Sequence, residues 1–191
     1  SYKKKRIGSI GDIACFSFDG IKNITSGEGG CIVSKDASVL SRVCDSRLLG
    51  VKSDSKMRFS GQRSWDFNVS HQGWRYHMSD IMAAIGLQQL NNFPQKASIR
   101  QSLAKKYDSL FAGHPSVRIL DRDYSNVVPH IYVIRIKGLT NRKYLQNELL
   151  AKDIQVGYHY QPNHRLTFFM QNEKNNLPVT ESVYPELLTL P

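Results

Sequence analysis

A single lysine, Lys22, stands in a polar loop between two short apolar runs, residues 14–18 and 31–33. The Asp-Gly pair and the glycines that bound these runs are typical of turns between β-strands. Lysine alone among side chains offers a primary amine on a flexible stem, which can bond to an aldehyde and move protons. A free lysine has a pKa of about 10.4, and desolvation favours its neutral, nucleophilic form. If both runs are core strands, Lys22 lies beside a buried strand and is a candidate catalytic residue. On spacing alone it can equally be an exposed loop lysine.

Two histidines late in the chain, His159 and His164, are close enough in sequence to suggest a metal site. Zinc ligands usually include cysteines or acids at short, regular spacings, and none lies near this pair. We therefore predict no metal. The three cysteines of the chain have no Cys-x-x-Cys spacing, which favours reduced thiols and a cytoplasmic protein.

The composition of the 191 residues fits a folded protein with one or two domains, because 40 % of them are hydrophobic. The formal net charge of +10 raises the question of nucleic-acid binding, yet the basic residues are spread along the chain. Only residues 3–6 form a basic run, and no nucleic-acid-binding motif accompanies it. We predict anionic small molecules, and not nucleic acid, as partners. No apolar run approaches the roughly 20 residues that cross a bilayer, so we predict no membrane partner.

The hydrophobic pattern predicts a chain of mixed α and β elements. After the strands at residues 14–18 and 31–33, the expected elements are a helix at 37–49, a loop at 51–72, a helix from Ser79 or Asp80 to Leu90, a helix at 94–113, strands at 117–120 and 131–136, a helix at 142–152, a strand at 154–160 and a partly helical segment at 177–190. The composition changes near Phe93, where we expect a boundary between two domains, residues 1–93 and 94–191. Short strands alternating with one good helix predict a small α+β unit for the second domain.

Eight residues around the lysine form one pattern in register: Phe16, Ser17, Phe18, Lys22, Gly27, Glu28, Gly29 and Gly30. This pattern resembles the lysine loop of the DegT/StrS-type sugar aminotransferases, which are pyridoxal 5′-phosphate (PLP) enzymes of fold type I. Residues 76–87 and 157–164 resemble two later segments of the same family. The resemblance implies an α/β fold in which residues 1–93 are the C-terminal part of the PLP-binding large domain. Residues 94–191 would then be a small, truncated α+β C-terminal domain, and we expect this half alone to be inactive.

The resemblance also implies three cofactor contacts. Lys22 would form the Schiff base with PLP, and Ser17 would donate a hydrogen bond to the phosphate, although a strand serine can instead bond to backbone. Residues 73–76, Gly-Trp-Arg-Tyr, stand where the family has Gly-Tyr-Asn-Tyr. That asparagine reaches the cofactor phosphate of the partner subunit, which implies a homodimer with shared active sites. Arg75 would take this role through its fork of donors, or would point into solvent.

The reaction that the resemblance implies is the transfer of an amino group from an amino acid, glutamate, to a keto sugar linked to a nucleotide. Such a reaction serves amino-sugar, lipopolysaccharide or related glycan biosynthesis. His159, Tyr160 and His164 would contact the sugar substrate, although Tyr160 can also be a packing aromatic. Two alternatives remain open. The related sugar dehydratases replace the lysine with histidine, so Lys22 argues against a dehydratase. A non-catalytic regulatory or interaction domain of the same fold is disfavoured by the complete lysine loop.

Overall fold

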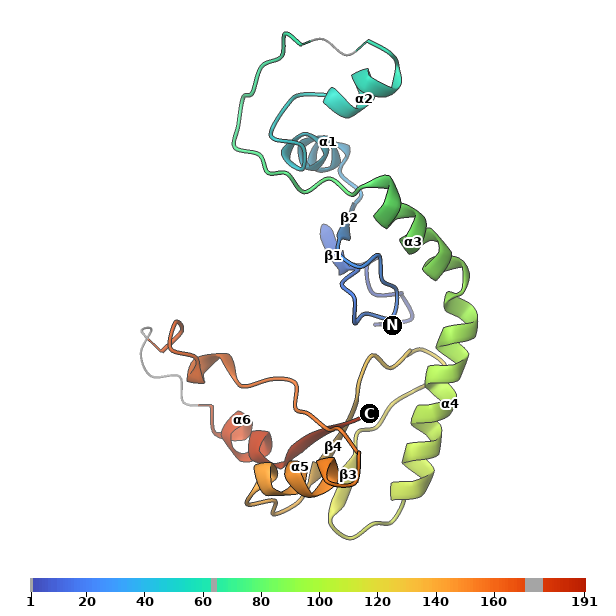
Figure 1. Ribbon diagram of the computed structural model, residues 1–191, viewed down its shortest axis with the longest axis vertical. Coiled ribbons are helices and arrows are strands. Elements are labelled where there is room, and N and C mark those ends of the chain that lie inside the picture. Colours follow the sequence, from blue (N-terminus) through green and yellow to red (C-terminus); the bar gives the residue numbers. More distant parts are fainter. Residues whose placement is uncertain (1, 63–64, 171–176) are drawn as a thin grey trace. The chain divides into compact units, whose positions relative to one another are not determined.

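The computed structural model describes residues 2–62, 65–170 and 177–191 (Figure 1). Tertiary contacts divide the chain into unit 1, Ser1–Lys96, and unit 2, Ala97–Pro191. Within the described ranges, no helix combines the length and the apolar character that a membrane span requires. The assignment of a cofactor-binding domain to residues 1–93 and of a small C-terminal domain to residues 94–191 stays a prediction.

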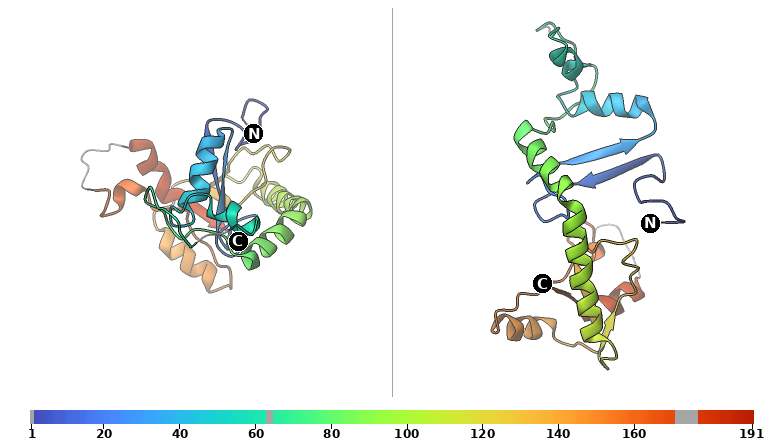
Figure 2. Two further views of the ribbon diagram at one scale, coloured as in Figure 1. Left: turned by 90° about the horizontal axis from the view of Figure 1, so that it is seen from above. Right: turned by 90° about the vertical axis from the view of Figure 1, so that its right-hand side faces the viewer.

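Unit 1 contains a β-hairpin and a series of helices. Strand β1 (Ile13–Ser17) pairs antiparallel with β2 (Gly30–Ser34) (Figure 2, right). The helices that follow in chain order are α1 (Ala37–Ser46), α2 (Asp54–Phe59), α3 (Asp80–Asn91) and the start of α4 (Phe93–Phe111). The two strands and the helices α1, α3 and α4 were expected close to these positions.

Side-chain caps explain where two of the helices begin. The Asp36 carboxylate accepts the amide of Ser38 at 2.8 Å before α1, and the Ser79 hydroxyl accepts the amide of Met82 at 3.3 Å before α3. Each cap satisfies an amide that has no partner inside its helix. Of the two residues expected to cap α3, Ser79 is therefore the one that does so.

The C-terminal end of α1 is set by a pairing with a later segment. The amide of Trp74 donates to the carbonyl of Ser46 at 2.7 Å, and the amide of Leu49 donates to the carbonyl of Trp74 at 3.0 Å. Leu49 and Gly50 have φ of 61° and 76°, a left-handed conformation that cannot continue the helix. The expectation of a helix to residue 49 is therefore wrong, because a tertiary pairing ends it at Ser46.

Two further expectations for unit 1 are wrong. Residues 51–72, expected as a loop, include the short helix α2, because a polar stretch without an apolar period gives no helix signal. The side chains of the hairpin, Phe16 and Ile32 among them, are exposed. Lys22 therefore does not lie beside a buried strand, since two paired strands bury little of either face.

Unit 2 contains an antiparallel three-stranded sheet with β4 (Tyr132–Ile136) in the middle. Strand β3 (Val117–Ile119) pairs with one edge of β4 and β5 (Leu187–Leu190) with the other. The helical segments of this unit are most of α4, then α5 (Arg142–Leu150), η1 (Asn163–Arg165), α6 (Pro178–Val183) and η2 (Tyr184–Glu186).

The core of unit 2 forms between α4 and this sheet. Tyr132 and Ile134 alternate along β4 and share one face, where Ile134 lies opposite Leu188 of β5. Ala104 of α4 is buried against the same cluster together with Val117 of β3. A small residue at this point of the helix lets the backbone come close to the sheet, so the strands are held by one continuous apolar cluster.

A polar cluster fixes the edge of this core. Asp108 of α4 accepts the hydroxyl of Tyr124 at 2.7 Å and the hydroxyl of Tyr132 at 2.6 Å. The guanidinium of Arg122 lies 4.7 Å from the ring centroid of Tyr132. Burial, followed by the bond to Asp108, raises the pKa of Tyr132 well above its ordinary value, so its hydroxyl remains a donor. The connection between β3 and β4 is thereby tied to α4.

The strand expected at residues 154–160 is wrong. This segment touches β5 through one isolated bridge, in which Gly157 and Thr189 exchange both backbone hydrogen bonds at 3.0 and 2.7 Å. His159 then bonds to the Thr189 side chain, so the backbone ladder does not continue. The third strand of the sheet is β5, which lies within residues 177–190, the segment expected to be partly helical. The helical part of that expectation is confirmed by α6 and η2.

The contact between Gly50 and Gly73 yields a testable prediction for unit 1. A Cβ on Gly73 would lie 2.0 Å from the Gly50 nitrogen, a backbone atom that cannot move aside cheaply. We expect Gly73→Ala to lower the free energy of unfolding by about 1–3 kcal/mol, the usual cost of overpacking. Urea unfolding of the full-length protein measures the change. Gly20→Ala is the matched control, because a Cβ there would lie 3.7 Å from its nearest neighbour. Equal unfolding midpoints for the two variants would contradict the close approach.

Candidate active site

Asp19 shapes the first turn of the lysine loop, residues 18–29, which joins β1 to β2. Its carboxylate accepts the amide of Ile21 at 3.1 Å, and its carbonyl accepts the amide of Lys22 at 3.0 Å. The amide of Asp19 in turn donates to the hydroxyl oxygen of Ser17 at 3.3 Å. Aspartate favours such turns because its short side chain bonds to the backbone two residues on. The turn holds Ser17 and Lys22 at the two ends of one short, locally bonded segment.

The far end of the lysine loop folds back onto Phe18. The amide of Phe18 donates to the carbonyl of Gly29 at 2.9 Å. Its carbonyl accepts the amide of Ser26 at 2.9 Å and the hydroxyl of Thr25 at 3.2 Å. These bonds use backbone groups and small hydroxyls, and none of them uses the Lys22 side chain. The loop can therefore hold its conformation while the lysine amine is engaged elsewhere.

Ser26 joins the lysine loop to α3. Its side chain is 1 % exposed, and its hydroxyl donates to the carbonyl of Glu28 at 2.6 Å. Gly86 of α3 faces it, and a Cβ on Gly86 would lie 3.4 Å from the Ser26 Cβ. Met78 approaches the loop as well, since a Cβ on Gly29 would lie 2.8 Å from its methyl group. The structure thus brings together two sequence motifs, the lysine loop and residues 76–87.

Two residues, Lys22 of the loop and Ser17 at the end of β1, fit a PLP site. The Lys22 side chain is half-buried and forms no hydrogen bond or ion pair with the part of the chain that the structure describes. A covalent PLP site needs a primary amine that is not engaged in an ion pair. Ser17 is exposed, and its hydroxyl accepts the Asp19 amide while keeping its proton to donate to a phosphate.

Arg75 lies in another part of unit 1, on the segment that pairs with the end of α1. It stands opposite Leu48 in an isolated antiparallel bridge, and the next amide, that of Tyr76, donates to the carbonyl of Arg47 at 2.8 Å. The backbone of Arg75 is therefore fixed on both sides, while its side chain is exposed. An exposed guanidinium on a fixed backbone suits a phosphate that another subunit presents, and it is equally compatible with solvent exposure.

The three late candidates lie in one segment of unit 2, residues 157–166. His159 Nδ1 is 3.0 Å from Oγ1 of Thr189, and His164 Nε2 is 2.5 Å from Oε1 of Glu181. Tyr160 stands between the histidines, is 69 % exposed, and meets the His159 ring edge-on with centroids 4.7 Å apart. The structure thus bonds both histidines to side chains of this chain and leaves the tyrosine accessible.

Glu181 of α6 is engaged on both carboxylate oxygens. Arg165 donates through Nε to Oε1 at 3.0 Å and through its fork to Oε2, and His164 shares Oε1. The hydrogen bonds from Arg165, and then from His164, lower the pKa of Glu181 to about 2 from its ordinary value of 4.5. Within the described ranges, no group of three or more His, Cys, Asp and Glu side chains is placed to hold a metal ion.

Several residues that hold the candidate site were missed from the sequence. Glu181 and Thr189 lie 17 and 30 residues from the histidines that they contact, and no spacing rule relates them. Ser26 and Gly86 are common residue types whose contact depends on the docking of α3. The glycine in the helical stretch of residues 76–87 was the one available signal, because glycine within a helix often marks a close approach.

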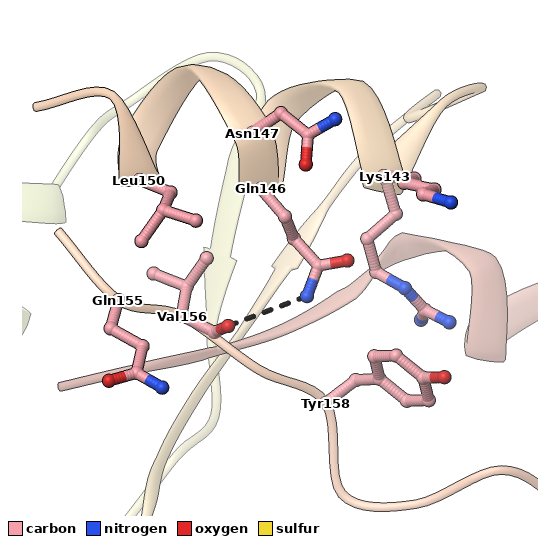
Figure 3. A pocket seen from close by; sticks show the side chains of 8 residues that line it. Lys143, Gln146, Asn147, Leu150, Gln155, Val156 and Tyr158 are labelled. Atoms are coloured by element: carbon pink, nitrogen blue, oxygen red, sulfur yellow. Dashed lines mark hydrogen bonds between the residues drawn. The ribbon is translucent and has the colours of Figure 1, made fainter.

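A groove of about 600 Å³ lies beside α5 in unit 2 (Figure 3). Its lining combines the side chains of Lys143, Gln146 and Tyr158, among others, and the Gln146 amide donates to the carbonyl of Val156 at 3.4 Å. The candidate substrate contacts at residues 159, 160 and 164 do not belong to this lining. The groove therefore includes Tyr158 of residues 157–166 in its lining, while the three candidate substrate contacts lie outside the lining.

Solved structures of sugar aminotransferases share this fold. The PLP and PMP forms of a putative sugar aminotransferase from Streptococcus pneumoniae are each 29 % identical to this chain, with TM-scores of 0.84 and 0.88. They cover 100 % of this chain, which spans 49 % and 50 % of theirs. PseC from Helicobacter pylori is an aminotransferase involved in the biosynthesis of pseudoaminic acid. It is 25 % identical to this chain with a TM-score of 0.89, and the match covers 100 % of this chain and 50 % of the PseC chain. The chain therefore has the mixed α/β fold of one half of a sugar aminotransferase.

Residues 1–191 match the DegT/DnrJ/EryC1/StrS aminotransferase family, and the chain belongs to this family. A curated relative, the UDP-4-amino-4,6-dideoxy-N-acetyl-beta-L-altrosamine transaminase of Campylobacter jejuni, is 30 % identical over 171 residues, 88 % of this chain and 43 % of the relative. An uncharacterized protein of Methanocaldococcus jannaschii is 30 % identical over 198 residues, 100 % of this chain and 51 % of the relative. The chain spans about half the length of the curated relatives that it matches. The resemblance of the lysine loop to this family is thereby confirmed.

The contacts of Glu181 predict how stability changes in acid. Because the folded pKa of about 2 lies below the ordinary 4.5, this stabilisation is complete above about pH 4.5 and is lost as the pH falls toward 2. As the pH is lowered from about 4.5 toward 2, we expect the free energy of unfolding to fall less in Glu181→Gln than in the wild type. The measurement is the urea midpoint of the full-length protein at a series of pH values.

Two comparisons make this test specific. Arg165→Gln should flatten the pH dependence in the same way, because it removes the first donor to the carboxylate. Added salt should reduce the difference in stability between the wild type and the variants, because the side chains of Arg165 and Glu181 are 38 % and 40 % exposed and their interaction is screened. The same pH dependence in wild type and both variants would contradict the pairing.

Proposed function

We propose that the full-length protein is a PLP-dependent aminotransferase that transfers an amino group from glutamate to a keto sugar linked to a nucleotide. The observation that carries the proposal is the lysine loop, which holds its conformation without the Lys22 side chain and leaves that amine unpaired among the described residues. The similarity to a UDP-sugar transaminase and to a PLP-bound sugar aminotransferase supports the same reading.

In this proposal PLP supplies the electron sink that lets an amino group leave one substrate and enter another. Lys22 holds the cofactor covalently and carries a proton between the reacting carbon and the nitrogen. Ser17 donates a hydrogen bond to the cofactor phosphate from the end of β1. Arg75 would bind the PLP phosphate in the active site of the partner subunit through two parallel donors. Each active site of a homodimer would then be built from two chains.

The substrate side of the proposal lies in unit 2. Residues 157–166 contact the nucleotide-linked sugar, with Tyr160, which is 69 % exposed, as one of the accessible side chains of the segment. The net charge of +10 favours the approach of an anionic nucleotide sugar. Such an enzyme serves amino-sugar, lipopolysaccharide or related glycan biosynthesis in the cytoplasm, where nucleotide sugars are made.

The first test of this proposal locates the cofactor. After borohydride reduction of the full-length holoenzyme and digestion, we expect the pyridoxyl group on the peptide that contains Lys22. Lys22→Ala should abolish transamination, because no other side chain supplies a primary amine at this position. Lys35→Ala, an exposed lysine just after β2, is the matched control and should keep its activity. An adduct on a different lysine, or full activity in Lys22→Ala, would overturn the assignment.

The second test concerns Arg75. We expect Arg75→Ala to weaken PLP retention by about tenfold or more, because it removes a charged donor from a phosphate dianion. Covalent attachment to Lys22 should recover at high PLP concentration. PLP affinity is measured by titration of the apoenzyme, and light scattering should show a dimer. Arg42→Ala, an exposed arginine of α1, is the control. Unchanged PLP affinity in Arg75→Ala, or an active monomer, would show that Arg75 is not a ligand across the interface.

A further inference from the structure

We propose that Glu181 is a positioning residue for substrate binding: through Arg165 and His164 it fixes one end of residues 157–166 and so presents Tyr160 to the nucleotide-linked sugar. The inference rests on the proposed function and adds a residue that sequence patterns do not reveal. It also gives His164 a role that acts through the conformation of the segment, and not through direct contact with the substrate.

The first end of the segment is fixed to β5. Gly157 and Thr189 exchange two backbone hydrogen bonds, and the Thr189 hydroxyl lies 3.0 Å from Nδ1 of His159. Thr189 is 6 % exposed and belongs to the sheet, so it provides a rigid support. The chain therefore enters the segment at a fixed position and in a fixed direction.

The second end of the segment is fixed to α6. Pro162, with φ of −58°, leads into the short helix η1, which carries His164 and Arg165. Both side chains converge on Glu181, whose two oxygens receive three hydrogen bonds. A fork of donors on a carboxylate sets direction as well as distance, which one hydrogen bond does not do. Removal of this single carboxylate would release both side chains at once.

Glu181 is itself supported by a cation–aromatic cluster around Tyr184. The guanidinium carbons of Arg142 and Arg165 lie 4.4 and 5.0 Å from the Tyr184 ring centroid. Arg142 also donates to the carbonyls of Tyr184 at 2.7 Å and Leu187 at 3.2 Å. These contacts tie Tyr184, the residue that follows α6, and Leu187 of β5 to α5, so the end of the helix that carries the carboxylate is held in place.

Tyr160 is therefore an exposed aromatic side chain on a segment that is fixed at both ends. A preorganised aromatic ring binds a sugar or a base at a lower entropic cost than a mobile one. Loss of Glu181 would free one end of the segment while the lysine loop, in unit 1, keeps all its contacts. The expected defect is thus in the binding of the nucleotide sugar and not in the chemistry of the amino-donor half-reaction.

The experiment compares the two half-reactions in Glu181→Gln of the full-length holoenzyme. The first half-reaction uses glutamate alone and is followed by the loss of PLP absorbance. The second uses the UDP-linked or dTDP-linked keto sugar that the wild type turns over fastest in a panel. We expect KM for that sugar to rise about tenfold, with kcat and the glutamate half-reaction close to wild type. Glu148→Gln, an exposed glutamate of α5, is the matched control.

Each other outcome has a distinct meaning. An unchanged KM in Glu181→Gln, with an active wild type, overturns the positioning role and leaves the proposed function intact. A loss of both half-reactions, or of PLP binding, would show a general structural role and would also overturn it. A wild type that binds PLP covalently but aminates no sugar of the panel removes the proposed function, and this inference with it.

A double-mutant cycle tests the role of His164. If His164 acts through Glu181, KM in the combined variant Glu181→Gln/His164→Gln should equal that of the more impaired single variant. If His164 contacts the sugar independently, the two increases in KM multiply, and the inference fails. Thermal unfolding of each variant shows whether the protein remains folded under the conditions of the assay.

Discussion

The close approach of α3 to the lysine loop is the contact on which the candidate cofactor site depends. Ser26 is 1 % exposed and lies against Gly86, while the methyl of Met78 lies against Gly29. Gly29 has a φ of 131°, which favours glycine, and a Cβ there would lie 2.8 Å from the Met78 methyl group, whereas a Cβ on Gly86 would make an ordinary contact with Ser26. The remaining hydrogen bonds of the loop are internal, so this docking sets where Lys22 lies within unit 1. A helix far from the lysine in sequence thus decides the position of the reactive amine.

Local patterns predicted the parts of the fold that local physics determines. Apolar alternation, helical period and capping residues located the hairpin, α1, α3, α4, α5 and the first two strands of unit 2. They placed the third strand at residues 154–160, which is wrong, because the third strand is β5. Residues 187–190 form the strand, with Leu188 opposite Ile134 in the buried cluster, whereas residues 154–160 pair with the sheet backbone through the isolated bridge at Gly157. Strand formation depends on neighbours that a single stretch does not display.

The candidate site also contains residues that the sequence alone indicates and residues that it does not. Lys22 and Ser17 can be proposed as site residues from the sequence because the pattern that contains them resembles the lysine loop of the family. Glu181 and Thr189 cannot, since each is an ordinary polar residue until the fold brings it to a histidine. Such partners matter for function because they decide whether a histidine is free to bind a ligand. In this chain both late histidines have a protein partner, and an interpretation of their role must include it.

The two candidate regions are stabilised by different kinds of contact, and this difference has a consequence for specificity. The lysine loop is held by backbone hydrogen bonds and by a close contact at Gly29, where a Cβ would lie 2.8 Å from the Met78 methyl group. One end of the candidate substrate segment is held by contacts between the side chains of Glu181, Arg165 and His164. If residues 157–166 bind the substrate as proposed, a change of these side chains would alter that segment while the hydrogen bonds within the lysine loop stay the same.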